Sequence, residues 1–232
     1  MSTIAPETDR RFPSVAEAGE AIVHCCRRLW EAGLIAGADG NVSVRIGPKA
    51  LLVTPTGLLK SELRPEDLVR VSLAGEHLGG FRKATSELDL HLRVQAGRPD
   101  AGAVVHAHPP TATGFAVAGE GLPGDVLPEL TLLFGEVPLA PYAMPGTRAV
   151  GDAIAPLLAG HEGALLANHG AVTWGPDLAT ARIRMESLEH AAKVLLAARG
   201  VGRVAHLTPD QVHALARRRG NPGHEQTDSR ER

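Results

Sequence analysis

The chain has few aromatic residues, no excess of either charge and no long apolar run. Aromatic side chains make up only 3% of its 232 residues, so we expect Leu, Val, Ala and Ile to build the core. A formal charge of −2 lacks the basic excess typical of nucleic-acid-binding proteins. No apolar segment is long enough to span a membrane, and the N-terminus lacks the apolar region of a signal peptide. These absences exclude nucleic acid and membrane as expected partners.

Cysteine is also scarce. Cys25 and Cys26 are adjacent within a helical pattern. Adjacent cysteines form neither a disulfide framework nor a CxxC motif, so we interpret them as packed thiols. Free thiols fit a reducing compartment, and the sequence therefore predicts a cytoplasmic protein.

Helix and strand patterns alternate along residues 14–216, which we predict to be one domain. "SVAE" at 14–17 is a capping box that starts a helix, and "GNVSVRI" followed by "ALLVT" predicts a hairpin. "TSELDLHLRVQAGRP" predicts a helix, "AGAVVHAH" a short buried strand and "VPLAPYA" a further strand. The hairpins exclude a purely parallel sheet, so we expect an α/β fold, a single-domain α/β/α sandwich with a central mixed, largely antiparallel sheet. The polar segments 1–13 and 217–232 are predicted to be disordered tails.

Two histidines stand one residue apart at the end of the predicted strand, in "VVHAHPP". Side chains alternate on a strand, so His106 and His108 point the same way, within reach of one ion. A catalytic zinc ion requires three protein ligands, and His169, at the end of the apolar run in "LLANHGAV", is the candidate third ligand. The alternative is that all three are strand-end and turn histidines held by hydrogen bonds.

Small polar residues beside glycine or at a helix start form a second group of candidates. Backbone N–H groups at a helix N-terminus, with hydroxyls nearby, bind phosphate without a cation, although each segment also reads as an ordinary turn or cap. Glu87 follows as either a general base near the metal or a carboxylate that stabilises the helix dipole. The phosphate candidates are Asn41, Thr56, Gly57, Thr85 and Ser86.

Five motifs, in this order, resemble class II aldolases of the fuculose-1-phosphate aldolase and ribulose-5-phosphate 4-epimerase (aldolase/adducin) family. They are "AGADGNVSVR", "LLVTPTGLLKSEL", "TSELDLHLRVQAGRPDAGAVVHAHPP", "APYAMPGT" and "LLANHGAVTWG", within roughly residues 14 to 200. The resemblance implies a central mixed sheet between helical layers and a C4 homotetramer with sites at subunit interfaces. It also implies one Zn²⁺ on the three histidines, with another divalent transition metal as the alternative. Glu87 would be the acid–base residue, and the five phosphate candidates would hold a phosphorylated sugar.

The resemblance leaves several reactions open. It favours a zinc-dependent aldolase that cleaves a ketose 1-phosphate, either fuculose-1-phosphate-like or a 5-deoxypentulose phosphate, to dihydroxyacetone phosphate and an aldehyde. In the epimerases of the family the residue at the position of Glu87 is an Asp, and in the dehydratases the carboxylate at this position is missing. Decarboxylases of phosphorylated sugar acids keep a similar Ser-Glu pair and stay as an alternative. Adducin-like scaffolds have lost the zinc histidines, which this chain retains.

The proton donor departs from the family pattern. Fuculose-phosphate aldolase uses tyrosines, one of them from the C-terminal region of a neighbouring subunit, whereas Tyr142 in "APYA" is the single tyrosine here and matches neither position. Glu129 in "LPELTLLFGE" follows His106 at a spacing close to that of the acid–base glutamate of the dehydratases. Burial among leucines would keep such a carboxyl protonated. Glu129 is therefore the candidate donor, with Glu136 and Tyr142 as alternatives.

Overall fold

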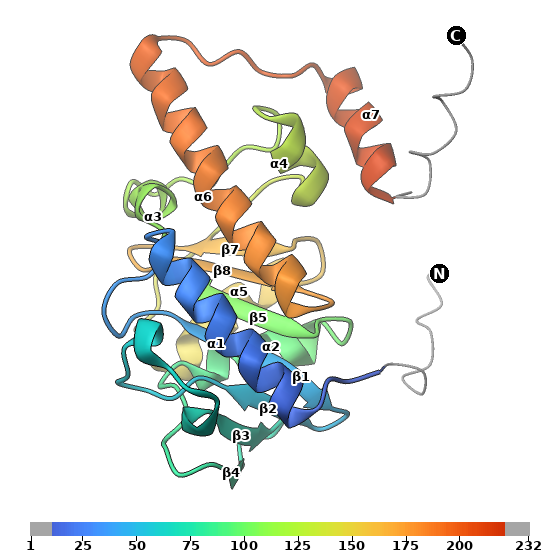
Figure 1. The fold of residues 1–232 in the computed structure, drawn as a ribbon. Coiled ribbons are helices and arrows are strands. Elements are labelled where there is room, and N and C mark those ends of the chain that lie inside the picture. The colour runs from blue at the N-terminus through green and yellow to red at the C-terminus, as the bar shows by residue number, and fades with distance from the viewer. Residues whose placement is uncertain (1–10, 221–232) are drawn as a thin grey trace, which may run out of the picture.

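The computed structural model describes residues 11–220, which form a sheet of eight strands with helices on both faces (Figure 1). The strand order is β4-β3-β2-β1-β5-β8-β7-β6. The strands are β1 (Asn41–Gly47), β2 (Ala50–Val53), β3 (Val69–Ser72), β4 (His77–Gly79), β5 (Ala103–Ala107), β6 (Leu139–Ala140), β7 (Gly163–Leu166) and β8 (Gly170–Gly175). The β6–β7 pair is parallel and the other pairs are antiparallel, so the predicted mixed, largely antiparallel sheet is confirmed.

The helices form two layers (Figure 1). They are α1 (Val15–Glu31), α2 (Leu88–Gly97), α3 (Pro110–Val117), α4 (Pro128–Leu133), α5 (Arg148–Ile154), α6 (Leu178–Val201) and α7 (Pro209–Gly220), with short 3-10 turns η2 (Lys60–Glu62), η3 (Pro65–Asp67) and η4 (Ala155–Leu157). One core joins α1, α3 and α6 to one face of the sheet, and a second core joins α2 and α5 to the other. The α/β/α sandwich is therefore confirmed. No described helix has the length and apolar character needed to span a bilayer.

The alternation of β1 and β5 decides which residues meet α2. Val42 and Val105 belong to the core under α1 and α6, whereas Val104 belongs to the core under α2. The register pairs Asn41 with His106 and Ser43 with Val104. Since successive side chains of a strand point to opposite faces, Asn41, Ser43 and His106 all face α2.

The structure differs from the predicted elements in two places near the site. The helix predicted from Thr85 begins at Leu88, because Thr85 N–H donates to Thr54 O at 3.0 Å and keeps this segment extended beside β2. The strand predicted in "VPLAPYA" shrinks to Leu139–Ala140, since the prolines on either side cannot donate to a ladder.

The predicted ends of the domain fall near the limits of the described residues. Helix α7 continues to Gly220, four residues beyond the boundary at 216, so residues 217–220 are helical rather than part of a disordered tail. Residues 11–13 have no regular secondary structure and lead into α1, whose capping box at Ser14 is present as predicted. The rest of the two predicted tails, 1–10 and 221–232, lies outside the described residues.

Candidate active site

The structure brings together the three histidines predicted as metal ligands. His106 lies within β5, His108 directly follows it, and His169 lies in the turn between β7 and β8. One ring nitrogen of each lies within 4.8 Å of the others, and the Nε2 atoms of His106 and His108 are 3.1 Å apart. Two nitrogen ligands of one tetrahedral zinc ion lie about 3.3 Å apart, so the donor set fits such an ion.

The turn that carries His169 depends on its two neighbours. Asn168 has a φ of 56°, a left-handed conformation that asparagine adopts more readily than most residues. A Cβ on Gly170 would lie 2.6 Å from Ala107 O and 2.7 Å from Cδ2 of His108. Only glycine therefore lets this turn approach β5 closely enough to bring His169 beside His108.

Hydrogen bonding and burial leave the ring nitrogens of the triad ready to bind a cation. His106 Nδ1 donates to Ala171 O at 2.9 Å, and this hydrogen bond orients the ring so that its Nε2 lies 3.1 Å from Nε2 of His108. Burial, together with the neighbouring His106, lowers the pKa of His169 to about 4 and also lowers the pKa of His108. Neutral imidazoles are the form that binds zinc and other transition metals.

The Glu87 carboxylate lies at the same point. Its Oε2 is 3.1 Å from Nε2 of His106, and its Oε1 is 3.3 Å from Nε2 of His169. Burial alone would raise the pKa of this carboxyl, but contacts with His106, Asn41 and His169 outweigh burial and hold the pKa well below its usual range. Glu87 occupies the N-cap position of α2 without accepting a capping hydrogen bond, so its carboxylate is directed into the site rather than onto the helix.

A pocket of about 320 Å³ opens beside the triad, and we call it the histidine pocket. Two extended segments, one after β2 and one before α2, pair to form one wall of the pocket. Thr56 N–H donates to Lys83 O at 3.1 Å, and Pro55 forms an isolated antiparallel β-bridge with Ala84. The lining includes His108, His169, Glu87 and all five residues predicted to bind phosphate, namely Asn41, Thr56, Gly57, Thr85 and Ser86.

The pocket also contains residues that the sequence analysis missed. Lys60 is 2% exposed, and its Nζ donates to Ala38 O and Leu58 O, both at 2.9 Å, so it joins the two loops of the pocket. Burial lowers the pKa of Lys60. Asp39 lies 3.6 Å from Nδ1 of His108. The sequence does contain a sign of Lys60, because a lysine within the apolar stretch "GLLKSEL", directly after the "TPTG" loop, suggests a buried charged group.

Two further missed residues, Ser43 and His91, lie behind Asn41 and are fully buried. His91 follows Glu87 by four residues, a spacing that puts both on one face of a helix, and this was the signal for it.

The predicted proton donors do not join this pocket within one subunit. Glu129 lies in the first turn of α4 and is exposed, so the burial expected to keep it protonated is not found in this chain. Tyr142 follows β6 and is 58% exposed. Neither is among the residues that line the histidine pocket.

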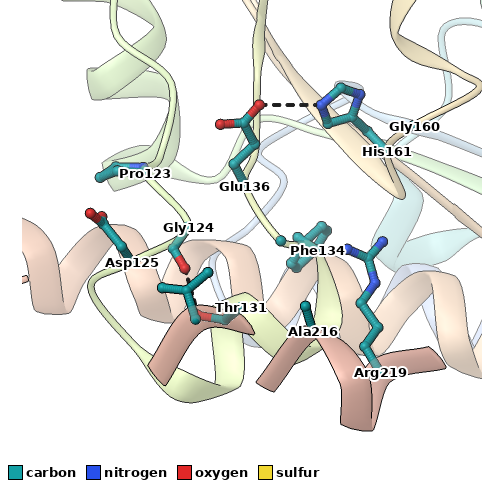
Figure 2. A pocket seen from close by; sticks show the side chains of 12 residues that line it. Pro123, Gly124, Asp125, Thr131, Phe134, Glu136, Gly160, His161, Ala216 and Arg219 are labelled. Carbon is teal, nitrogen blue, oxygen red and sulfur yellow. Dashed lines mark hydrogen bonds and ion pairs between the residues drawn. The ribbon is translucent and has the colours of Figure 1, made fainter. Parts of the chain in front are cut away.

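A larger pocket of about 530 Å³ lies between α4, α7 and the loop at Gly160 (Figure 2). Glu136, the other alternative donor, pairs there with His161 at 3.4 Å, and Arg219 enters from α7 (Figure 2). None of the triad histidines lines this pocket, so it is not the candidate active site.

Comparison with known proteins agrees with this geometry. Residues 20–196 match the model of the class II aldolase and adducin N-terminal domain. A 3-oxo-tetronate 4-phosphate decarboxylase of Pectobacterium atrosepticum is 33% identical over 90% of this chain and 97% of its own length. A 5-deoxy-D-ribulose 1-phosphate aldolase of Bacillus thuringiensis serovar kurstaki is 33% identical over 86% of this chain and 93% of its own length. An L-fuculose 1-phosphate aldolase structure superposes with a TM-score of 0.83 at 28% identity, covering 89% of this chain and 97% of that one. The chain therefore belongs to the class II aldolase/adducin family.

Proposed function

We propose that the protein is a metal-dependent aldolase that cleaves a ketose 1-phosphate to dihydroxyacetone phosphate and an aldehyde. The observation that carries the proposal is the position of the Glu87 carboxylate, 3.1 and 3.3 Å from Nε2 of His106 and His169, in a pocket lined by polar groups suited to phosphate. The relative named as a 5-deoxy-D-ribulose 1-phosphate aldolase supports a 5-deoxypentulose phosphate as substrate. A fuculose-1-phosphate-like sugar is the other candidate.

The proposed roles follow from the chemistry of each group. A divalent ion on the triad, for which we propose zinc, would supply a Lewis acid that withdraws electron density from the ketose carbonyl. Glu87 would return a proton to C3 after the C3–C4 bond breaks, and would remove that proton in the condensation direction. Hydroxyl and backbone N–H groups of Thr56, Gly57 and Ser86 would hold the phosphate, with Lys60 supplying positive charge in the wall.

The proposed reaction also needs a second proton transfer, at the C4 hydroxyl of the substrate. Cleavage requires a group that takes the proton of the C4 hydroxyl, and Glu129 is the candidate from the sequence, with Glu136 and Tyr142 as alternatives. All three are exposed in the single chain, so in the homotetramer that we propose any of them would act in the pocket of a neighbouring subunit. We also propose a cytoplasmic location, in keeping with the two free cysteines.

A second candidate is the decarboxylation of a phosphorylated 3-oxo sugar acid. The relative named as a 3-oxo-tetronate 4-phosphate decarboxylase favours it at the same 33% identity. The chemistry of the pocket also supports it, because loss of carbon dioxide breaks a carbon–carbon bond without first removing a hydroxyl proton. Among the described residues that line the pocket, Asp39 and Glu87 supply the carboxyl groups and there is no tyrosine.

One panel of substrates separates these reactions. Purified protein with zinc is incubated with 5-deoxyribulose 1-phosphate, fuculose 1-phosphate, ribulose 5-phosphate and 3-oxo-tetronate 4-phosphate. We expect release of dihydroxyacetone phosphate from a ketose 1-phosphate, and loss of this activity in Glu87→Gln. Release of carbon dioxide from the oxo acid, without cleavage of any ketose phosphate, would show that the decarboxylase proposal is the correct one.

A further inference from the structure

A continuous chain of polar side chains leads through the protein interior to the Glu87 carboxylate. Ser43 Oγ lies 2.7 Å from Nδ1 of His91, and Nε2 of His91 lies 2.6 Å from Oδ1 of Asn41. Asn41 Nδ2 then donates to Oε2 of Glu87 at 2.9 Å. Ser43 and His91 are completely buried, and Asn41 is 5% exposed. The chain connects β1, which holds Ser43 and Asn41, to α2, which holds His91.

The positions of the protons follow from the end of this chain. An ionised carboxylate only accepts hydrogen bonds, so Asn41 presents its NH₂ group to Glu87 and its Oδ1 to His91. Nε2 of His91 must then carry a proton and donate it. Full burial, helped by His106, lowers the pKa of His91 to about 3, so the ring is neutral and its Nδ1 accepts from the Ser43 hydroxyl. Every donor in the chain points toward Glu87.

We infer that His91 is a positioning residue, which fixes the side-chain amide of Asn41 so that its N–H groups face Glu87 and the substrate phosphate. The inference rests on the proposed function. An amide can rotate by 180° with almost no change in shape, so packing alone does not select the orientation. The reverse orientation would direct an oxygen atom at a carboxylate and a phosphate, both of which only accept hydrogen bonds.

The chemical character of His91 argues against a role in packing alone. Its neighbours Leu90 and Val94 on α2 are also buried, and they fill their part of the core with apolar side chains. Burying an imidazole costs free energy unless both of its nitrogens are hydrogen-bonded. Both nitrogens of His91 have hydrogen-bond partners. The second N–H of Asn41 is left for the histidine pocket, which Asn41 lines. Control of this amide therefore affects the base and the phosphate site together.

Two substitutions at one position separate positioning from packing. In His91→Gln the new NH₂ group can still donate to Oδ1 of Asn41, whereas His91→Leu has no donor. With zinc-loaded protein, binding of inorganic phosphate is measured by calorimetry, and exchange of the C3 proton of dihydroxyacetone phosphate by NMR. We expect His91→Leu to weaken phosphate binding and to slow exchange, each by about 10- to 100-fold, as is usual when a supporting hydrogen bond is lost, and His91→Gln to stay close to wild type.

Controls make both directions of the result informative. His24→Leu makes the same change at an exposed position of α1 and should leave phosphate binding unchanged. Asn41→Ala removes the amide itself and should weaken phosphate binding at least as much as His91→Leu does. If the Leu variant binds phosphate and exchanges the proton as well as the Gln variant does, His91 only packs and the inference is wrong.

A measurement on the wild-type protein covers the case in which His91→Leu does not fold. Imidazole ¹H–¹⁵N NMR, assigned by the signal that disappears in His91→Gln, should show a proton on Nε2 and none on Nδ1. A proton on Nδ1 would overturn the inference. Failure of the proposed reaction gives a different outcome. A wild-type protein that binds phosphate but cleaves no ketose phosphate contradicts the aldolase proposal, whereas phosphate binding and the imidazole NMR spectrum still test the role of His91.

Discussion

Replacing Glu87 by glutamine removes a proton acceptor while preserving the shape of the side chain. In the native site both carboxylate oxygens lie within 3.3 Å of a triad nitrogen, and Oε2 accepts from Asn41 at 2.9 Å. The amide oxygen of glutamine can still accept from Asn41, so we expect the pocket to keep its form. A positioned general base contributes about 10²- to 10⁴-fold to rate, which corresponds to about 2.7–5.4 kcal/mol of activation free energy. We expect Glu87→Gln to lose at least the lower of these factors.

The assay follows exchange of the C3 proton of dihydroxyacetone phosphate with deuterated solvent by NMR, because this step needs no aldehyde. Metal content is measured on the same sample and should stay at the wild-type level. Glu20→Gln, the same change at an exposed position of α1, should leave the exchange rate unaltered. Wild-type exchange in Glu87→Gln would refute the assignment of Glu87 as the base. Loss of the metal together with the exchange would instead make Glu87 a ligand.

Four further predictions concern other parts of the site. Elemental analysis should find about one divalent ion per subunit, and single His→Ala changes at His106, His108 or His169 should lower it; full metal content in all three variants would contradict the triad. Ser86→Ala should raise KM for a phosphorylated ketose and leave kcat nearly unchanged, since ground-state binding is lost, and an equal effect on a non-phosphorylated substrate would count against a phosphate contact. The pKa of His91 falls from 6.5 to about 3 on folding, so the unfolded chain binds a proton at a higher pH than the folded chain does, and the metal-free protein should lose stability as the pH drops through this interval. Urea unfolding at a series of pH values gives the free energy of unfolding as a function of pH. In His91→Gln the slope of this dependence should be smaller by up to about 1.4 kcal/mol per pH unit. Glu129→Gln, compared with Tyr142→Phe, should depress turnover by roughly 10²-fold if Glu129 supplies the second proton transfer, and an unchanged pH–rate profile would leave Tyr142 as the residue to pursue.

Several features could be predicted from the sequence because they depend on neighbouring residues. The capping box at Ser14 and the alternation of "GNVSVRI" both specify local backbone geometry, and the structure has the helix and the strand where these patterns put them. The HxH spacing likewise places His106 and His108 on one side of a strand end. The phosphate candidates were named from small polar residues beside glycine or at a helix start, a pattern that ordinary turns and caps share, and all five line the pocket.

Two expectations from the sequence were wrong near the site or at its proposed proton donor. Thr85 would begin a helix by its own preference, but Thr54 accepts its N–H and the helix begins three residues later. Glu129 was expected to be buried because leucines surround it in the sequence, yet helical periodicity turns Leu130 inward and Glu129 outward. A distant segment decides the first case, and the packing of Leu130 against the core decides which side of α4 faces solvent in the second.

Residue patterns were enough to name the three candidate metal ligands and the strand ends that carry them. The buried groups behind these residues could be identified only from the folded chain. Ser43, Asn41 and Glu87 are joined through His91, although Ser43 and His91 are 48 positions apart and Asn41 and His91 are 50 apart. They meet because antiparallel pairing sets Asn41 opposite His106 and turns both toward α2. A register of this kind is a property of two strands together, and shifting it by one residue would turn Asn41 to the opposite face, away from Glu87.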